Sequence, residues 1–210
     1  MELTLHDDYV YTTMLDLNLE QQKLNALRMQ GYIENQFLDK ETKGFSESTP
    51  ITTKLYDKYN YLMYPLVGMG TLYENIREIF HICAREQNFG LDLFDEYHMQ
   101  CWLNVYNKDD FIDWHGHWPS KWSSWHGFYC VNVEPESNTT YMIRETKQHI
   151  KIDSKNNLLV LSPSGRDSHK SSKWNYDEPR ITVAFDIVPT MLLQEKKNPF
   201  YGQPNHWIPI

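Results

Sequence analysis

The chain has 210 residues, of which 40% are hydrophobic and 23% charged, a composition typical of a globular protein with a substantial core. Its 20 lysines and arginines stand against 28 aspartates and glutamates. This net charge of −8 argues against a nucleic-acid-binding surface, because phosphates need clustered cations. No apolar run approaches the roughly 20 residues of a membrane span, and the acidic N-terminus does not resemble a signal peptide. Three cysteines without a CxxC pattern indicate reduced thiols, so we expect a cytoplasmic protein.

Residues 1–97 are expected to form a mixed, partly helical layer. Hydrophobic residues recur at helical spacing in two stretches, 17–29 and 72–83, and Gly31 and Gly90 are the expected stops. The stretch between them predicts a polar loop. The residues that define the first apolar stripe are Leu17, Leu19, Leu24, Leu27 and Met29.

Residues 98–190 predict one short strand after another, with turn residues between them. The six segments that favour strands are "HMQCWLNVY", "GFYCVNV", "TTYMIRE", "QHIKI", "NLLVLSP" and "RITVAFDIV". Many short strands at regular spacing are typical of a sandwich, a barrel or a jelly roll.

Residues 191–210 form a tail with prolines and aromatic residues, in which no long helix or strand is expected. We expect Phe200, Tyr201 and Trp207 to dock on the rest of the protein. Nothing in the sequence reads as a linker, so the chain is interpreted as a single domain over residues 1–210.

Histidines and tryptophans gather in the stretch "DWHGHWPSKWSSWHG", residues 113–127. His115 and His117 are two residues apart, a spacing that puts both side chains on one face of a strand. His169 follows the strand "NLLVLSP" about fifty residues later. Because antiparallel strands bring such distant residues to one barrel mouth, the three histidines predict a mononuclear metal site. The tryptophans fit a packed aromatic loop and a substrate-facing wall equally well.

The last strand, "RITVAFDIV", has two different faces. Ile181, Val183, Phe185 and Ile187 form an apolar face that should pack against the helices, while Arg180, Thr182, Ala184 and Asp186 share the other face. A buried arginine is costly unless it is paired, and its guanidinium pairs well with a carboxylate. The pattern therefore predicts a site for a small dicarboxylate beside the metal.

The segments "HGHWPSKWSSWHGFYCVNV", "NLLVLSPSGRDSH" and "RITVAFD" resemble, in this order, the iron(II)- and 2-oxoglutarate-dependent oxygenases of the double-stranded β-helix fold. The closest branch has an H-x-H first motif, and the resemblance covers residues 98–190. It implies a mainly β protein, with a double-stranded β-helix (jelly-roll) core and a helical N-terminal layer. It also implies a dioxygenase, a hydroxylase, that uses iron(II), 2-oxoglutarate and O2.

The resemblance assigns the iron to His115, His117 and His169. It gives the distal carboxylate of 2-oxoglutarate to Arg180 and Thr182.

A second donor to 2-oxoglutarate is expected from Tyr129, on the assumption that it shares an inward face with Gly127 and Val131. Most members of the superfamily have an acidic residue where this chain has His117. Asp113 is the alternative carboxylate for the triad. His126, which is expected at a strand edge, is the alternative imidazole.

Two other functions stay open at this point. One is a cupin-like three-histidine metal dioxygenase that does not use 2-oxoglutarate, and the other is a non-enzymatic jelly-roll module that binds a ligand. We expect a small-molecule or peptide substrate and neither a nucleic-acid nor a membrane partner. The sequence leaves open a homodimer, the identity of the substrate and the oxidative outcome.

Overall fold

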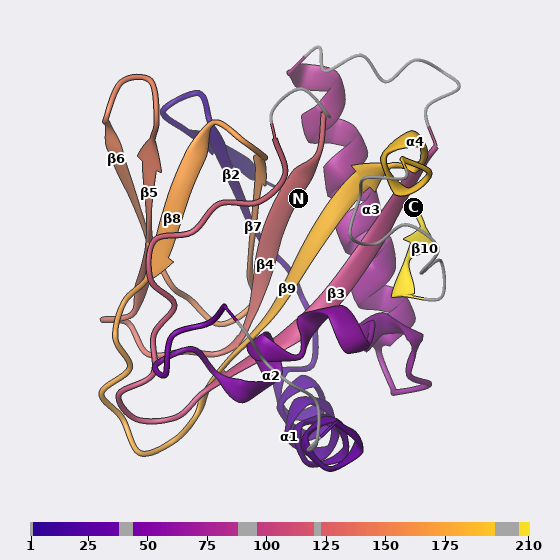
Figure 1. Ribbon diagram of the computed structural model, residues 1–210, viewed down its shortest axis with the longest axis vertical. Coiled ribbons are helices and arrows are strands. Elements are labelled where there is room, and N and C mark those ends of the chain that lie inside the picture. Colours follow the sequence, from indigo (N-terminus) through magenta and orange to yellow (C-terminus); the bar gives the residue numbers. More distant parts are fainter. Residues whose placement is uncertain (1, 38–43, 88–95, 120–122, 196–205) are drawn as a thin grey trace.

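The computed structural model describes residues 2–37, 44–87, 96–119, 123–195 and 206–210, and it contains two antiparallel sheets. The larger sheet has the strand order β1-β2-β7-β4-β9-β3-β10 and the smaller one has the order β6-β5-β8. Figure 1 shows the smaller sheet on one side of the larger sheet and the long helices on the other. The strands are β1 (Leu3–His6), β2 (Val10–Met14), β3 (Tyr97–Tyr106), β4 (Trp125–Asn132), β5 (Asn138–Ile143), β6 (His149–Asp153), β7 (Leu158–Pro163), β8 (Asp167–Ser171), β9 (Arg180–Pro189) and β10 (Ile208–Pro209).

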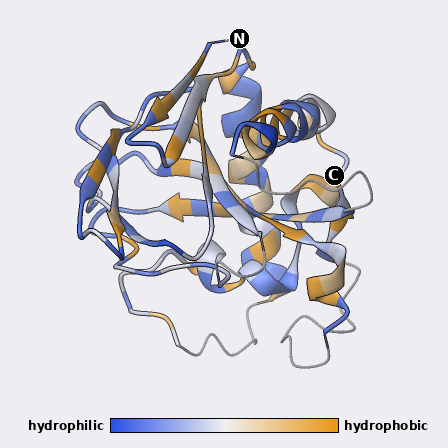
Figure 2. Cartoon of the chain, turned by 90° about the horizontal axis from the view of Figure 1, so that it is seen from above, coloured by the Kyte–Doolittle hydropathy of each residue, from blue (hydrophilic) through white to orange (hydrophobic). Residues whose placement is uncertain are grey.

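The helices are α1 (Leu19–Gln36), α2 (Ile51–Lys54), α3 (Met69–Glu86), α4 (Thr190–Leu193) and the 3-10 turns η1 (Tyr56–Lys58) and η2 (Tyr61–Met63). The two long helices, α1 and α3, cover the outer face of the larger sheet (Figure 1), whereas α2 and η1 contribute Thr53 and Tyr56 to a cavity on the other side. In α3 the expected apolar spacing is confirmed, since Leu72, Ile76, Phe80 and Cys83 are buried one turn apart in the main core. Figure 2 shows hydrophobic and hydrophilic residues alternating around the helices and along the strands.

Helix α1 differs from the expectation in its end and in its buried face. It continues through Gly31 to Gln36, because Ile33 extends the buried stripe by one more turn. Leu24 and Leu27 were expected to be buried, but they are exposed to 42% and 39%. The buried face instead includes Asn25, whose side chain donates to the carbonyl oxygen of Val67 and so ties α1 to the loop before α3. The expected stop of the second helix, Gly90, lies outside the described residues.

The first two strands were not expected, because β1 and β2 are short and "VYTTM" shows no clear alternation of apolar and polar residues. They form a hairpin whose turn has Asp7 and Asp8 at φ values of 46° and 54°, a left-handed conformation that aspartate tolerates better than most residues. β2 pairs with β7, so the hairpin extends the larger sheet. The hairpin also brings Tyr9 to the interior between the two sheets.

Strand β9 lies between β3 and β4 and is paired with both along most of its length. As expected, Ile181, Val183, Phe185 and Ile187 belong to the core under the helices. Arg180, Thr182, Ala184 and Asp186 face the opposite way and line a cavity on the side of the smaller sheet.

The C-terminal residues return to the sheet. β10 pairs with β3, and Trp207 is buried against Val188 and Leu192. Phe200 and Tyr201, which were expected to dock as well, lie outside the described residues. Within the part of the chain that the structure describes, every helix is too short or too polar to cross a lipid bilayer.

A substitution at Gly127 on β4 would show how closely the central strands pack. A Cβ atom there would overlap the carbonyl oxygen of Val160 and the ring of Phe185. We therefore expect Gly127→Ala to lower the free energy of unfolding by about 3 kcal/mol, the upper end of the usual cost of overpacking. Urea unfolding measures this. The control is Gly70→Ala on α3, where no atom lies within 4 Å of the added methyl group and a gain of about 0.5 kcal/mol is expected. Equal stability of Gly127→Ala and the unchanged protein would contradict this packing.

Candidate metal centre

Three histidines that are far apart in the sequence meet at one end of a cavity. His115 and His117 lie on the segment between β3 and β4, and His169 lies on β8. Each ring contributes one nitrogen atom to the cluster, and these three nitrogen atoms lie within 4.8 Å of one another. The backbones of His115 and His169 are joined by two hydrogen bonds of 3.0 and 2.8 Å. This isolated bridge and the neighbouring hydrogen bonds between Ile112 and Ser171, rather than the regular strand that the sequence suggested, hold the two parts of the cluster together.

Each of the three rings turns its Nδ1 toward an oxygen atom. The contacts are His115 Nδ1 to the carbonyl oxygen of Asp113 (2.8 Å), His117 Nδ1 to Oδ1 of Asp186 (2.6 Å) and His169 Nδ1 to Oδ2 of Asp167 (2.9 Å). Because carbonyl and carboxylate oxygens only accept, Nδ1 carries the proton in each ring. In a neutral ring of this kind Nε2 keeps its lone pair, which is the state that binds a metal ion.

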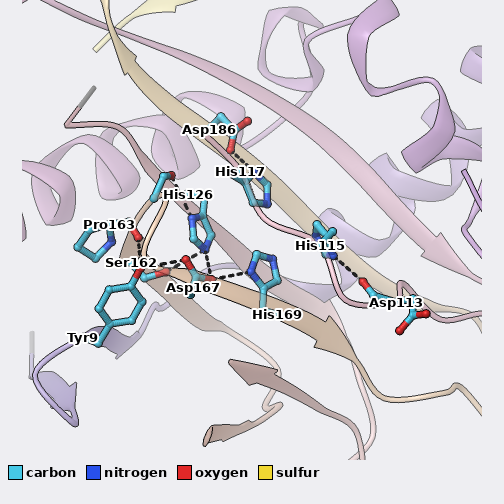
Figure 3. A network of polar contacts seen from close by, with 11 residues as sticks. Tyr9, Asp113, His115, His117, His126, Ser162, Pro163, Asp167, His169 and Asp186 are labelled. Carbon is cyan, nitrogen blue, oxygen red and sulfur yellow. Dashed lines mark hydrogen bonds and ion pairs between the residues drawn. The ribbon is translucent and has the colours of Figure 1, made fainter. Parts of the chain in front are cut away.

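Asp167 is the centre of a buried polar network, which Figure 3 shows. The hydroxyl of Tyr9 is shared between two acceptors, Oδ1 of Asp167 at 2.9 Å and the carbonyl oxygen of Pro163 at 2.5 Å, and His169 Nδ1 and His126 Nε2 lie 2.9 and 3.6 Å from Oδ2. Burial alone would raise the pKa of Asp167. The neighbouring His126 ring and the hydrogen bonds from His169 and Tyr9 outweigh burial and hold this pKa well below its usual value. Asp167 is therefore ionised at neutral pH.

Burial has the opposite effect on the histidines. It holds the pKa of His115 well below its usual value, and the neighbouring imidazoles add to the effect. Burial also lowers the pKa of His169, although Asp167 opposes it. For His117 burial alone would lower the pKa, but the carboxylate of Asp186 outweighs burial and raises it. The site thus favours neutral imidazoles at His115 and His169 and a strongly polarised one at His117.

His126 is not at a strand edge as expected, because β4 lies between β7 and β9 and the side chain is 2% exposed. Its Nδ1 and Nε2 lie 3.1 and 3.0 Å from the hydroxyls of Ser164 and Ser162. Its ring is stacked against His117 and His169, with centroids 4.4 and 4.7 Å away. Because both of its ring nitrogens have a serine hydroxyl as partner, His126 contacts the candidate ligands by stacking and offers no free nitrogen.

Asp113, the alternative carboxylate, is exposed, and its side chain accepts a hydrogen bond of 2.7 Å from the backbone of Trp114. In Figure 3 its carboxylate points away from the histidines, so the structure does not bring it into the cluster. The carboxylates that do contact the rings are Asp167 and Asp186, and neither was singled out from the sequence. The Asp-x-His spacing before His169 was the available signal, since it places both side chains on one strand face.

Arg180 lies in the same cavity, which has a volume of about 530 Å³. Its side chain is 1% exposed, and its guanidinium carbon lies 4.9 Å from the centre of the Tyr106 ring. Nη2 donates to Ser154 Oγ at 3.4 Å, whereas Nε and Nη1 have no hydrogen-bond partner among the described residues. A buried cation with free donors is costly, so this position fits a bound anion.

Thr182 lines the cavity next to Arg180, as the strand pattern predicted. Its Oγ1 accepts a hydrogen bond of 3.2 Å from Asn104 Nδ2, and Asn104 Oδ1 accepts one of 2.6 Å from Thr53. This chain of contacts uses the Thr182 oxygen as an acceptor, and the hydroxyl of Thr182 also contacts that of Tyr106.

The expectation for Tyr129 is wrong. Tyr129 is the cross-strand neighbour of Val183 on β9 and therefore faces the helical layer, where it belongs to the main core. Its hydroxyl donates to Asn157 at 2.5 Å, away from the cavity. His126, Phe128 and Cys130 are the β4 residues that lie opposite the cavity-facing residues of β9. The strand alternates as expected, but the assignment was off by one residue, and such a shift reverses every side chain.

No family model matches this chain, and no curated protein matches it either. Several solved structures, however, are similar to it. A prolyl-4-hydroxylase from Pseudomonas putida is 12% identical over 85% of this chain and 92% of that one, with a TM-score of 0.54. AviO1 from Streptomyces viridochromogenes Tue57 is 12% identical over 86% and 89%, with a TM-score of 0.55. SnoN, a non-heme alpha ketoglutarate dependent epimerase from nogalamycin biosynthesis, is 9% identical over 85% and 76%, with a TM-score of 0.54. At these identities the likeness shows the fold, and it confirms the expected jelly-roll core with flanking helices.

The hydrogen bond from Tyr9 to the Asp167 carboxylate has a measurable effect on stability. We expect Tyr9→Phe to lower the free energy of unfolding by about 1.5–3 kcal/mol at neutral pH, the usual range for a hydrogen bond to a charged group. The folded pKa of Asp167 lies below its unfolded value, so the stabilisation from its charge is present above the unfolded pKa. It is lost as the pH falls through the folded pKa, and the difference between the two proteins should shrink there.

Chemical unfolding of metal-free protein at neutral and acidic pH measures both effects. Tyr176→Phe is the matched control, because Tyr176 also donates to a carboxylate, Glu136, but at an exposed position. We expect Tyr176→Phe to change stability by less than about 0.5 kcal/mol. A cost for Tyr9→Phe no larger than that of Tyr176→Phe would contradict the network.

Proposed function

We propose that this protein is an iron(II)/2-oxoglutarate-dependent oxygenase, a dioxygenase that acts as a hydroxylase. One observation carries the proposal. Three imidazoles with free Nε2 atoms and a buried arginine with two unpartnered donor atoms line the same cavity. The fold supports the proposal, because the similar structures include a prolyl-4-hydroxylase and an alpha ketoglutarate dependent epimerase.

The residues fit the metal. His115, His117 and His169 offer three nitrogen ligands, and imidazole suits iron(II). The contacts of the Nδ1 atoms with oxygen atoms orient the rings before any metal binds. We therefore assign the iron to these three histidines, and we leave Asp113 out because its carboxylate is not directed toward them.

The residues also fit 2-oxoglutarate. Arg180 would bind the distal carboxylate through the donor atoms that have no partner in the protein, and Thr182 would donate its hydroxyl proton to the same group. The guanidinium of Arg180 lies over the ring of Tyr106, which stabilises its position by a cation–π interaction. Tyr129 has no part in this site.

When bound, iron and 2-oxoglutarate together activate O2 for oxidation of a substrate C–H bond, and the protein positions and shields them. The shielding comes from an aromatic wall. The ring of Trp102 stacks on His117 with centroids 6.2 Å apart, Tyr56 packs edge-on against Trp102 at 5.6 Å, and Phe45 continues the row. A small molecule or a peptide side chain would reach the metal along this wall.

The two alternatives are less well supported. A cupin-like dioxygenase that does not use 2-oxoglutarate gives no role to the buried charge of Arg180. A binding module without catalysis gives no role to three histidines with free Nε2 atoms. We also propose that residues 1–210 function as one cytoplasmic domain without nucleic-acid or membrane partners. In support, the sheet that carries Arg180 also includes strands from both ends of the chain.

Absorption spectroscopy tests the proposal directly. Protein mixed anaerobically with iron(II) and 2-oxoglutarate should show the weak visible charge-transfer band of that chelate, and O2 with a suitable substrate should then release succinate. Metal binding without this band would favour the cupin-like alternative. A protein that binds neither compound would favour the binding module.

We expect His169→Ala to weaken iron(II) binding by more than about 100-fold, because loss of a ligand should exceed the 10–100-fold cost of losing a group that only supports one. The fold should survive, since His169 lies on the short outer strand of the smaller sheet. Anaerobic titration with iron(II) measures the affinity, and circular dichroism checks the fold. His81→Ala on α3, outside the cavity, is the control and should bind normally. Normal affinity in His169→Ala would exclude His169 as a ligand.

We expect Arg180→Ala to weaken 2-oxoglutarate binding while metal binding is kept. Charge-assisted hydrogen bonds contribute about 1.5–3 kcal/mol each. Loss of the guanidinium should therefore raise the dissociation constant for 2-oxoglutarate by about tenfold to a few hundredfold. Arg180→Lys should recover only part of the affinity, because an ammonium group lacks the planar fork.

Calorimetric titration of 2-oxoglutarate into the iron-loaded variants measures this effect. Arg77→Ala, at an exposed position on α3, controls for the loss of one positive charge. Equal affinities in Arg180→Ala and Arg77→Ala would remove the strongest argument for 2-oxoglutarate.

A further inference from the structure

The three candidate ligands are neutral groups, so they bring no negative charge to a divalent cation. The structure nevertheless places two carboxylates directly behind them. Asp167 contacts His169 and Asp186 contacts His117, and the two carboxylates are exposed to only 0% and 7%. Among the described residues, no lysine or arginine lies within 4 Å of either carboxylate. Two buried negative charges are costly unless a cation lies near them.

Asp186 has the simpler surroundings of the two. Its Oδ1 lies 2.6 Å from His117 Nδ1, and its Oδ2 accepts a hydrogen bond of 3.0 Å from Trp118 Nε1. These two contacts come from consecutive residues of the segment between β3 and β4. One carboxylate thus binds both a candidate ligand and the residue next to it.

The backbone of Asp186 is held on both sides. It lies opposite Gln100 on β3 and opposite His126 on β4, near the middle of the larger sheet. In its described part, residues 107–119 and 123–124, the segment that carries His117 has no regular strand, and it has one β-bridge, at His115. Asp186 therefore connects an irregular segment to a rigid strand at the point where the ring of His117 must be oriented.

We propose that Asp186 is the positioning residue of the metal centre: it orients His117 and supplies, from outside the ligand set, the negative charge that an all-histidine triad lacks. This inference rests on the metal role proposed above. Asp186 does not contact the metal in this arrangement and acts through the imidazole, whose Nε2 it makes a stronger donor.

Asp186 could act by holding its neighbours in place or by its negative charge, and the variant Asp186→Asn distinguishes these two roles. Asn at position 186 keeps an oxygen that accepts a hydrogen bond but removes the charge. If Asp186 only held Trp118 and His117 in place, Asp186→Asn would bind metal normally. If the charge matters, the variant should bind metal about 10–100-fold more weakly.

The experiment is a titration of metal-free protein with cobalt(II), followed by visible absorption. We expect Asp186→Asn to show the weaker affinity and shifted cobalt bands, with a thermal unfolding temperature in the absence of metal that is no lower than that of the unchanged protein. Asp153→Asn, which removes an exposed carboxylate on β6, should behave like the unchanged protein. Trp118→Phe, which loses the tryptophan contact but keeps the charge, should retain the normal cobalt spectrum.

A charge exchange gives a second, independent test. His117→Asp alone would place a new carboxylate near Asp186, so we expect weak cobalt binding. His117→Asp combined with Asp186→Asn removes this repulsion and should bind cobalt(II) more tightly than either single variant. This comparison keeps the proposal testable even if Asp186→Asn alone folds poorly.

The outcomes separate the two proposals. Normal affinity and normal bands in Asp186→Asn, or tighter binding in His117→Asp alone, would overturn the role of Asp186 and leave the metal site standing. A cobalt spectrum disturbed as strongly by Trp118→Phe as by Asp186→Asn would reduce Asp186 to a structural contact. If the unchanged protein does not bind cobalt(II), the proposed function itself fails, and the role of Asp186 fails with it.

Discussion

The alternation of side chains along β9 is the constraint on which the rest of the structure depends. β9 is paired on both sides, so each residue must face either the helices or the cavity. The apolar face closes the main core under α3, and the other face presents Arg180 at one end and Asp186 at the other. One strand thus builds the core and also places a charged residue at each end of the cavity, the buried Arg180 at one end and Asp186, beside the candidate ligand His117, at the other.

These charges also explain why the cavity fits two ligands better than one. Without ligands, the protein keeps a guanidinium with two unpartnered nitrogens at one end and two buried carboxylates at the other. A cation bound by the histidines would offset Asp167 and Asp186, and a dicarboxylate would offset both Arg180 and the cation. The aromatic wall around His117 lowers the local dielectric and makes each of these interactions stronger.

The polar network around Asp167 combines residues from distant parts of the chain. Tyr9 comes from the N-terminal hairpin, Asp167 and His169 from the smaller sheet, and His126 from the centre of the larger one. The rings stack behind one another, and each side-chain nitrogen that does not face the cavity has an oxygen partner. These contacts orient the rings without any bound ligand, which the proposed binding of a metal and a cosubstrate requires.

The sequence by itself determined the features that depend on local patterns. Six of the seven described strands from β3 to β9 (all but β8), the buried face of α3, the two faces of β9 and the choice of three histidines with an arginine follow from periodicity and residue chemistry, together with the resemblance that the motifs show. Only the tertiary structure decided which residues of β4 face the cavity, that β1 and β2 join the larger sheet, and that Asp186 rather than Asp113 accompanies His117. The physical reason is the same in each case. A strand's own pattern fixes that its side chains alternate, but the pairing with strands fifty or more residues away fixes which set faces inward and which distant carboxylate meets a given imidazole.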